Sequence, residues 1–259
     1  MVMEKRYRYE QPPVLISASL CNWYATLAGK LLLTEIKACL DDLLTEVFGY
    51  HAVQVGCIAL SADLLGGSRI KHQVRIDLDP QVADVVADGA ALPLDADCID
   101  LVVLMHTLDF AAQPYNVLRE VERVLIPEGR LIVVGFNPWS TYGLWHLALG
   151  WRNRLPWCGQ FHSNSKLKDW LSLLGFVTER CNYCGFRPPV QHAGLLQRLA
   201  LMERIGRRAL PIFGGIRMLT ARKRVATLTP LKPRWQRRNL VSGKLAEPST
   251  RAHTNVQTR

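Results

Sequence analysis

Two nearly continuous apolar runs, separated by an amphipathic segment, constrain the fold of this chain most. Ile99–Met105 and Arg130–Phe136 consist almost entirely of aliphatic residues. Runs of this length without polar alternation are typical of strands covered on both faces. Between them, Val117–Leu125 spaces its apolar residues as a helix does, and Pro127 follows it. Buried strands separated by helices predict an α/β fold with a largely parallel sheet.

Periodicity and turn residues predict the remaining elements. Further helices are expected over Leu27–Phe48, Leu60–Gly66, Lys166–Leu174 and Ala193–Leu210, and further strands over Ala52–Cys57, Val74–Leu78, Val82–Ala87, Phe176–Tyr183 and Arg217–Leu228. This order predicts a doubly wound, mostly parallel seven-stranded sheet. We expect an N-terminal helical extension over 1–48, the α/β domain over 49–228 with a helical insertion at about 190–212, and a basic, disordered tail over 229–259.

Composition narrows the class of protein and its compartment. No apolar run approaches the ~20 residues that a membrane span needs, and Met1–Pro13 lacks the apolar core of a secretory signal. The seven cysteines are therefore expected to be reduced thiols. Cys181 and Cys184 form a single CxxC motif, which is a weak zinc signal without a second one, so we predict no metal. A cytoplasmic protein without a membrane span is expected.

Positive charge is concentrated at the C-terminal end. From Arg198 to Arg259 the sequence holds 15 Lys and Arg residues against two acidic ones, whereas the rest of the chain is slightly acidic. A basic region of this kind favours phosphate contacts with RNA, DNA or acidic lipid. The alternative is a solvated helix face followed by a charged tail. Any nucleic-acid partner would therefore be bound through this region.

Three motifs in the middle of the chain carry a family resemblance. They are Asp88–Asp100 leading into the apolar Leu101–Leu104, the helix, Pro/Gly turn and strand of Val117–Val134, and the acidic Ile76–Pro80. In this order they resemble class I S-adenosylmethionine-dependent methyltransferases of the type 11 kind, over roughly residues 50–185. Gly135–Leu144 is similar to an uncharacterised bacterial branch of that family, the YafS-like proteins. The resemblance implies the Rossmann-like methyltransferase fold and S-adenosylmethionine as methyl donor.

The resemblance also implies a cofactor site at the strand ends. Asp77 would accept the two ribose hydroxyls and Asp88 the adenine amino group. Gly89 would let the backbone approach the ring, and Met105 would form one wall of the pocket. Two of them have a plainer alternative: Asp77 as a solvated strand end, and Gly89 as a turn residue.

His106 is the candidate catalytic residue, because it follows Met105 and is the titratable side chain best placed to contact an acceptor. The first glycine motif departs from the family pattern. Gly56 is its one glycine and is expected to contact the cofactor, but Ile58 and Leu60 follow it, and Gln54 replaces the acidic residue of the preceding strand.

Two functions from different classes follow. The first is methyl transfer from S-adenosylmethionine to an unknown acceptor, for which a small molecule is the candidate. The second is a non-catalytic protein of the same fold, in which the altered glycine loop marks lost cofactor binding and the basic C-terminal region binds RNA or protein. An NAD-dependent oxidoreductase is disfavoured, because no G-x-G-x-x-G follows the first predicted strand.

Overall fold

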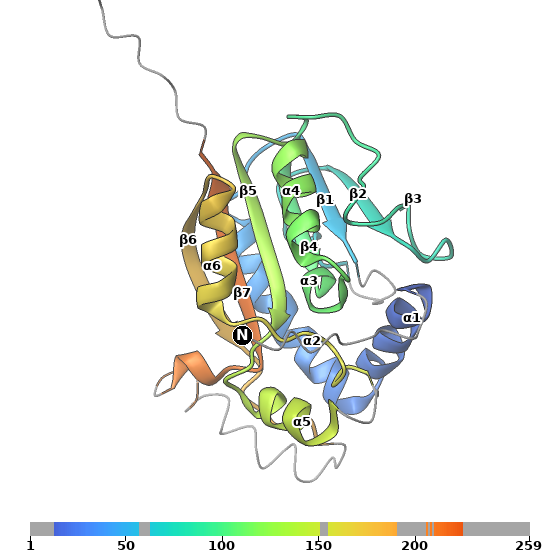
Figure 1. Ribbon diagram of the computed structural model, residues 1–259, viewed down its shortest axis with the longest axis vertical. Coiled ribbons are helices and arrows are strands. Elements are labelled where there is room, and N and C mark those ends of the chain that lie inside the picture. The colour runs from blue at the N-terminus through green and yellow to red at the C-terminus, as the bar shows by residue number, and fades with distance from the viewer. Residues whose placement is uncertain are drawn as a thin grey trace, which may run out of the picture. The chain divides into compact units, whose positions relative to one another are not determined.

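The computed structural model describes residues 13–56, 63–150, 155–190, 206, 208 and 210–224. Seven strands form one sheet (Figure 1). They are β1 (His51–Val55), β2 (His72–Asp77), β3 (Val85–Val86), β4 (Ile99–Met105), β5 (Leu125–Phe136), β6 (Phe176–Cys184) and β7 (Ile216–Lys223). Their order is β3-β2-β1-β4-β5-β7-β6.

The first five strands run parallel, and β7 is inserted antiparallel between β5 and β6. The chain crosses from β3 on one side of β1 to β4 on the other. Ligands of open parallel sheets bind outside the carboxyl ends of the strands at such a reversal of strand order. The predicted doubly wound, mostly parallel seven-stranded fold is confirmed.

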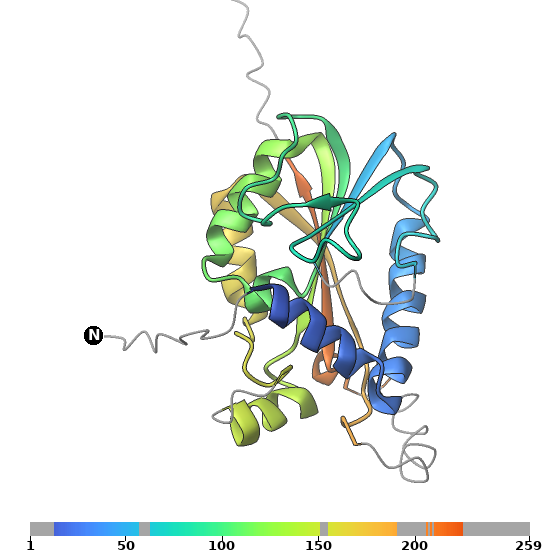
Figure 2. The same cartoon turned by 90° about the vertical axis from the view of Figure 1, so that its right-hand side faces the viewer.

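Helices cover both faces of the sheet. They are α1 (Pro13–Tyr24), α2 (Leu27–Leu44), α3 (Thr107–Phe110), α4 (Pro114–Val124), α5 (Thr141–Leu149) and α6 (Asn164–Leu173), with a short 3-10 helix, η2 (Pro211–Phe213). Figure 2 shows α4 and α6 on one face and α2 on the other. Among the described residues, no helix is long and apolar enough to cross a membrane.

The alternating side chains of β4 explain its unbroken apolar sequence. Leu101, Val103 and Met105 belong to the hydrophobic cluster that contains α2. Val102 and Leu104 belong to the cluster that contains α4 and α6. Because successive side chains of a strand point to opposite faces, both faces must be apolar when both are covered. β4 therefore lies between two hydrophobic cores and contributes side chains to both.

Most predicted elements are present at nearly the predicted positions, and three helices, α1, α3 and α5, were not predicted. The predicted helix Ala193–Leu210 lies almost wholly outside the described residues, and Leu60–Gly66 is described only from residue 63, where the chain forms turns. The chain divides into one compact unit, Met1–Val225, and a second, Ala226–Arg259, that lies outside the described residues. Residues 190–212, the predicted insertion, are described only in small part.

Candidate functional site

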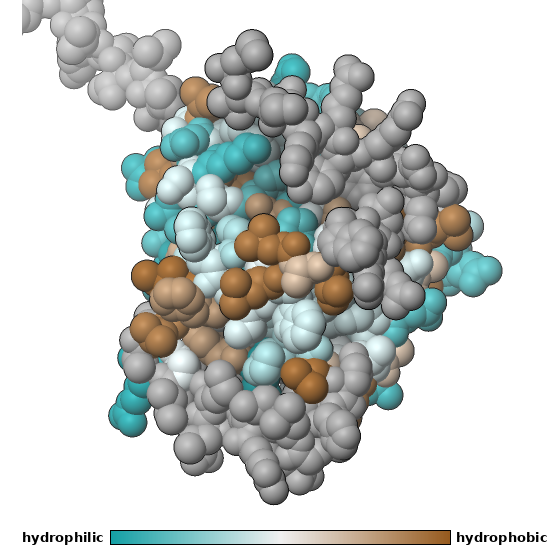
Figure 3. Space-filling model, turned by 60° about the horizontal axis from the view of Figure 1, so that its bottom comes forward, coloured by the Kyte–Doolittle hydropathy of each residue, from teal (hydrophilic) through white to brown (hydrophobic). Residues whose placement is uncertain are grey.

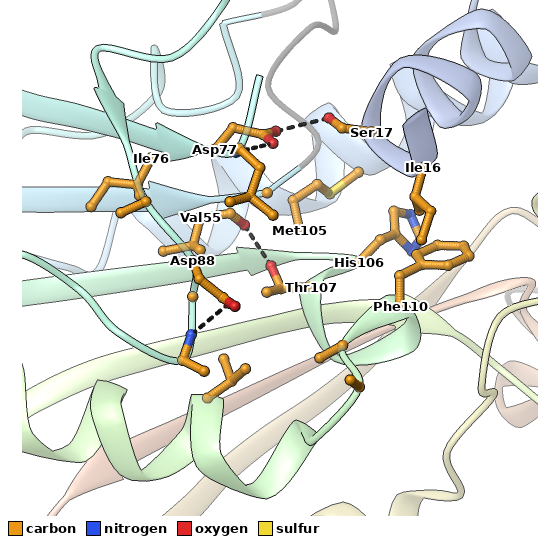
Figure 4. A pocket seen from close by; sticks show the side chains of 18 of the residues that line it. Ile16, Ser17, Val55, Ile76, Asp77, Asp88, Met105, His106, Thr107 and Phe110 are labelled. Atoms are coloured by element: carbon orange, nitrogen blue, oxygen red, sulfur yellow. Dashed lines mark hydrogen bonds between the residues drawn. The ribbon is translucent and has the colours of Figure 1, made fainter. Parts of the chain in front are cut away.

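A cavity of about 340 Å³ opens at the carboxyl ends of β1, β2 and β4. Residues from six separate segments line it, and they include all those expected from the sequence to contact cofactor or acceptor: Gly56, Asp77, Asp88, Gly89, Met105 and His106. Figure 4 shows Asp77 and Asp88 toward one side of the cavity and Ile16, His106 and Phe110 toward the other. The fold therefore brings the six predicted residues to one place, which is large enough for a small ligand.

Asp77 ends β2 with a carboxylate that the protein itself holds in position. The side chain is buried, and its Oδ2 accepts a hydrogen bond from the hydroxyl of Ser17 in α1 at 3.0 Å. Its Oδ1 accepts the backbone N–H of Leu78 at 2.6 Å. A carboxylate has about four acceptor positions, and these two hydrogen bonds occupy two of them.

Asp88 and Gly89 follow β3 and approach the cavity from the next strand end. Asp88 is exposed, and its Oδ1 accepts the N–H of Ala90 at 2.9 Å, which fixes the turn. Gly89 is buried, and a Cβ there would lie only 3.1 Å from Thr107 Cγ2 and 3.2 Å from Val55 Cγ1. The absent side chain therefore lets the backbone lie close to the wall of the cavity.

Gly56 ends β1 in a conformation that favours glycine. Its φ is +80°, and a Cβ would lie 2.6 Å from the hydroxyl oxygen of Thr107. That hydroxyl donates to the carbonyl of Val55 at 2.7 Å, so the crowding atom is fixed. Ile58 and Leu60, which depart from the family's glycine motif, lie outside the described residues. Gln54 is described and is buried within β1.

His106 lies in the left-handed region, with φ of +55°, and its ring is buried. Its Nε2 lies 2.6 Å from the hydroxyl oxygen of Tyr24, and its Nδ1 lies 2.9 Å from Asp109 Oδ2. The ring also stacks on Phe136 at 4.3 Å between centroids. Both ring nitrogens are therefore engaged within the protein, although the residue lines the cavity.

Beneath this network lies a second layer of buried polar groups. The guanidinium of Arg217 donates to the carbonyl of His162 at 2.6 Å, and His162 Nε2 lies 3.0 Å from the carbonyl of Leu108. Burial lowers the pKa of His162 below its usual value, although the Asp109 carboxylate opposes this. Burial likewise lowers the pKa of Arg217. These groups support the α3 turn rather than reach the cavity.

The cysteines of the CxxC motif do not converge. Cys181 and Cys184 are three residues apart on β6, so their side chains leave opposite faces of the strand. No disulfide joins any two of the six cysteines that the structure describes. Within the described part of the chain, no group of three or more His, Cys, Asp or Glu side chains is arranged to hold a metal ion.

Sequence reasoning missed the residues that α1 and α3 bring to the cavity. Ile16, Ser17 and Leu20 come from α1, and Thr107 and Phe110 from α3. The one signal for α1 is Pro13, which suits the first position of a helix. The helix has apolar residues on all sides and no charged residue, so no amphipathic period marks it. α3 has only four residues, too few for any period to show.

The residues present fit the nucleoside of S-adenosylmethionine. Two carboxylates from adjacent strand ends supply acceptors for hydroxyl and amino donors. At Gly56 and Gly89 a Cβ would crowd Thr107, at 2.6 and 3.1 Å, so the two glycines allow the chain to pack tightly at the wall of the cavity. The remaining walls are mostly apolar, as a purine ring requires.

Comparisons with known proteins agree with this geometry. Residues 38–133 match the family model of a methyltransferase domain. The match and the fold show a methyltransferase domain of the class I fold, and they indicate S-adenosylmethionine as the methyl donor. Within this class the chain belongs to the YafS family. It is 31% identical over 224 residues to the uncharacterised protein YafS of Escherichia coli (strain K12), which covers 86% of this chain and 88% of that protein.

Solved structures show the same fold at low sequence identity. A methyltransferase of Thermotoga maritima described as S-adenosylmethionine-dependent is 18% identical, with a TM-score of 0.58 over 78% of this chain and 93% of that one. Another, from Mesorhizobium loti, is 16% identical, with a TM-score of 0.52 over 74% of this chain and all of that one. The predicted family, fold and cofactor are confirmed, while the roles of the individual site residues stay predictions.

Proposed function

We propose that this protein transfers the methyl group of S-adenosylmethionine to a small acceptor with an apolar body, and that the cavity at the ends of β1, β2 and β4 holds both molecules. One observation carries the proposal. Asp77 and Asp88, predicted from the sequence as the two nucleoside ligands, line the same cavity, together with both glycines that let the backbone approach.

The nucleoside end is assigned to the two carboxylates. Asp77 would accept the ribose hydroxyls, with the Ser17 hydroxyl holding the carboxylate from the other side. Asp88 would accept the adenine amino group, and Gly89 would pass beneath the ring. Met105 and Gly56 would contact the cofactor from the ends of β4 and β1.

The acceptor end is assigned to the apolar side of the cavity, where Ile16, Leu20 and Phe110 lie. The sulfonium of the cofactor supplies an already activated methyl group. The protein's own task is then to hold the acceptor in line and to exclude water. An apolar lining of this kind favours an acceptor whose body is itself apolar.

For His106 we propose a positioning role. To accept a proton from an acceptor, its ring would have to release either Tyr24 or Asp109, both of which it contacts within 3 Å. Its bonds instead tie the end of α1 to the end of β4, and so keep Ile16 and Ser17 over the cavity.

The partner and the compartment are also proposals. RNA or DNA binding through the basic C-terminal region remains the prediction made from the sequence, and most of that region lies outside the described residues. A cytoplasmic location likewise remains the prediction made from the sequence.

Calorimetric titration of the purified protein with S-adenosylmethionine and with its demethylated product tests the proposal. We expect micromolar binding by the unmodified protein. Asp77→Asn and Asp88→Asn should each weaken it about tenfold or more, because each loses a charge-assisted hydrogen bond worth roughly 1.5–3 kcal/mol.

Asp79→Asn is the matched control. Asp79 lies in the loop after Asp77, and its Oδ1 accepts the N–H of Gln81 within that loop, but it does not line the cavity. It should leave the affinity unchanged. If the unmodified protein gives no heat at millimolar ligand, the cofactor assignment is wrong and the non-catalytic alternative gains support. Equal weakening by all three variants would contradict the specific roles of Asp77 and Asp88.

A further inference from the structure

The helix α5 exposes an unusual amount of apolar surface for its length. None of its nine residues is Asp, Glu, Lys or Arg. Tyr142 and Gly143 face the core, and Tyr142 stacks on Phe136. On the outer side Leu144 is 68% exposed and Leu147 is 77% exposed. A helix that is apolar on its solvent side as well as on its core side is not explained by the fold alone.

The same surface continues beyond the helix. Asn137 joins the turn before α5 to η2, because its side-chain amide donates to the carbonyls of Ile212 and Gly214 at 2.7 and 2.9 Å, and its Oδ1 accepts the N–H of Trp139. The turn before α5 therefore lies beside η2, and both segments expose apolar side chains. We call them the apolar face: Trp139, Leu144, Trp145, Leu147, Leu210, Ile212 and Phe213. Figure 3 shows hydrophobic side chains gathered on this side of the molecule.

The sequence around the apolar face is basic and lacks acidic residues. No Asp or Glu occurs between Gly129 and Lys168, nor between Arg204 and Ala246. Arg208, two residues before Leu210, is exposed. Segments that lie in the headgroup region of a bilayer typically combine tryptophan and leucine with arginine and lack carboxylates.

We propose that the apolar face docks onto the surface of an anionic lipid bilayer, with Trp139, Leu144 and Leu147 entering the headgroup–acyl boundary and neighbouring arginines contacting lipid phosphates. Charge argues against a second copy of the chain as the occupant. A symmetric dimer through this face would bring the basic residues of both copies together, and the segments 130–167 and 205–245 supply no Asp or Glu to pair with them. An anionic membrane satisfies both the apolar and the basic character of the surface.

Co-sedimentation of the full chain with lipid vesicles tests this inference. One set contains phosphatidylglycerol and phosphatidylcholine in equal parts, and the other phosphatidylcholine alone. We expect binding to the anionic vesicles and little to the neutral ones. The double variant L144E/L147E should bind the anionic vesicles about tenfold less, since two leucines no longer enter the boundary and two new carboxylates face anionic lipid.

Leu173→Glu is the matched control, because Leu173 is 74% exposed on α6, away from the apolar face. It should bind as the unmodified protein does. Circular dichroism melts should show all variants folded, since each replaced side chain is solvent-exposed. The remaining binding of L144E/L147E, supplied by basic residues elsewhere, should vanish at high salt, whereas the unmodified protein should keep part of its binding.

Three outcomes would overturn the proposal. The first is no binding of the unmodified protein to anionic vesicles. The second is equal binding by the unmodified protein and L144E/L147E at every salt concentration. The third is a dimer, detected by light scattering, that L144E/L147E converts to a monomer while no vesicle binding occurs, which would identify a second copy as the occupant. None of these measurements requires the cofactor, so the inference stands or falls independently of the proposed function.

Discussion

At the scale of single residues, Gly56 illustrates how the end of one strand is adapted to the cavity. Two separate constraints exclude a side chain there: a φ of +80°, and the hydroxyl of Thr107, which would lie 2.6 Å from a Cβ. Gly175 shares the first constraint, with a φ of +79°, but the nearest atom to its Cβ is 3.5 Å away. Alanine variants at Gly56 and Gly175 therefore distinguish the cost of backbone strain from the cost of crowding.

We expect Gly56→Ala to destabilise the protein by about 3 kcal/mol and Gly175→Ala by about 1 kcal/mol, because a left-handed alanine costs roughly 1–2 kcal/mol and only Gly56 is also crowded. Urea unfolding of both variants measures the difference. Equal losses would show that Thr107 moves aside without cost, and that Gly56 is required only for its backbone conformation.

Some residues of the candidate site could be predicted from the sequence, and others could not. Asp77 and Asp88 were predicted because the sequence motifs that contain them resemble those of the methyltransferase family. Ser17 was not, since its role depends on α1 meeting the end of β2, a contact between residues 60 apart in the sequence. That His106 engages both its nitrogens likewise depends on Tyr24 and Asp109, whose positions only the folded chain defines.

At the scale of elements, the packing of α1 decides how the cavity is covered. Thr26 caps α2 by accepting the N–H of Gly29, and a Cβ on Gly29 would collide with the backbone of Trp23 and Tyr24 at the end of α1. The two helices therefore meet at a tight corner. From this corner α1 extends to the ends of β2 and β4, where Ser17 contacts Asp77 and Tyr24 contacts His106.

Tyr24→Phe should destabilise the protein by about 1–3 kcal/mol, because it leaves a buried nitrogen of His106 without its hydroxyl partner. Amide hydrogen exchange should accelerate in α1 more than in α6. Tyr50→Phe is the control, because Tyr50 is 81% exposed. Unchanged stability and exchange in Tyr24→Phe would mean that the contact does not hold α1 over the cavity.

Strands and long amphipathic helices were predictable, whereas α1 and α5 were not, for one physical reason. Periodicity reveals an element only when one face is apolar and the other polar. β4 was recognised from its continuous apolar run, and α4 from its charged outer face. α1 and α5 carry no Asp, Glu, Lys or Arg, so neither shows a polar face. The antiparallel insertion of β7 also left no local signal, because strand order depends on contacts distant in sequence.

At the scale of the whole compact unit, the cavity and the apolar face lie at the same edge of the sheet. His106 at the end of β4 stacks on Phe136 at the end of β5, and Phe136 stacks in turn on Tyr142 of α5. A protein bound to a bilayer through the apolar face would therefore present this edge, with its cavity, toward the membrane. The fold and the family are established, and the proposed function depends on where S-adenosylmethionine binds.

A crystal structure of the full chain with S-adenosylhomocysteine would test this most directly. The account predicts electron density for the nucleoside at the ends of β1, β2 and β4, with ribose hydroxyls within hydrogen-bond distance of Asp77 and the adenine amino group within hydrogen-bond distance of Asp88. Density for the ligand at another place, or side chains of the loop after Gly56 filling the cavity in crystals soaked at saturating ligand, would contradict it.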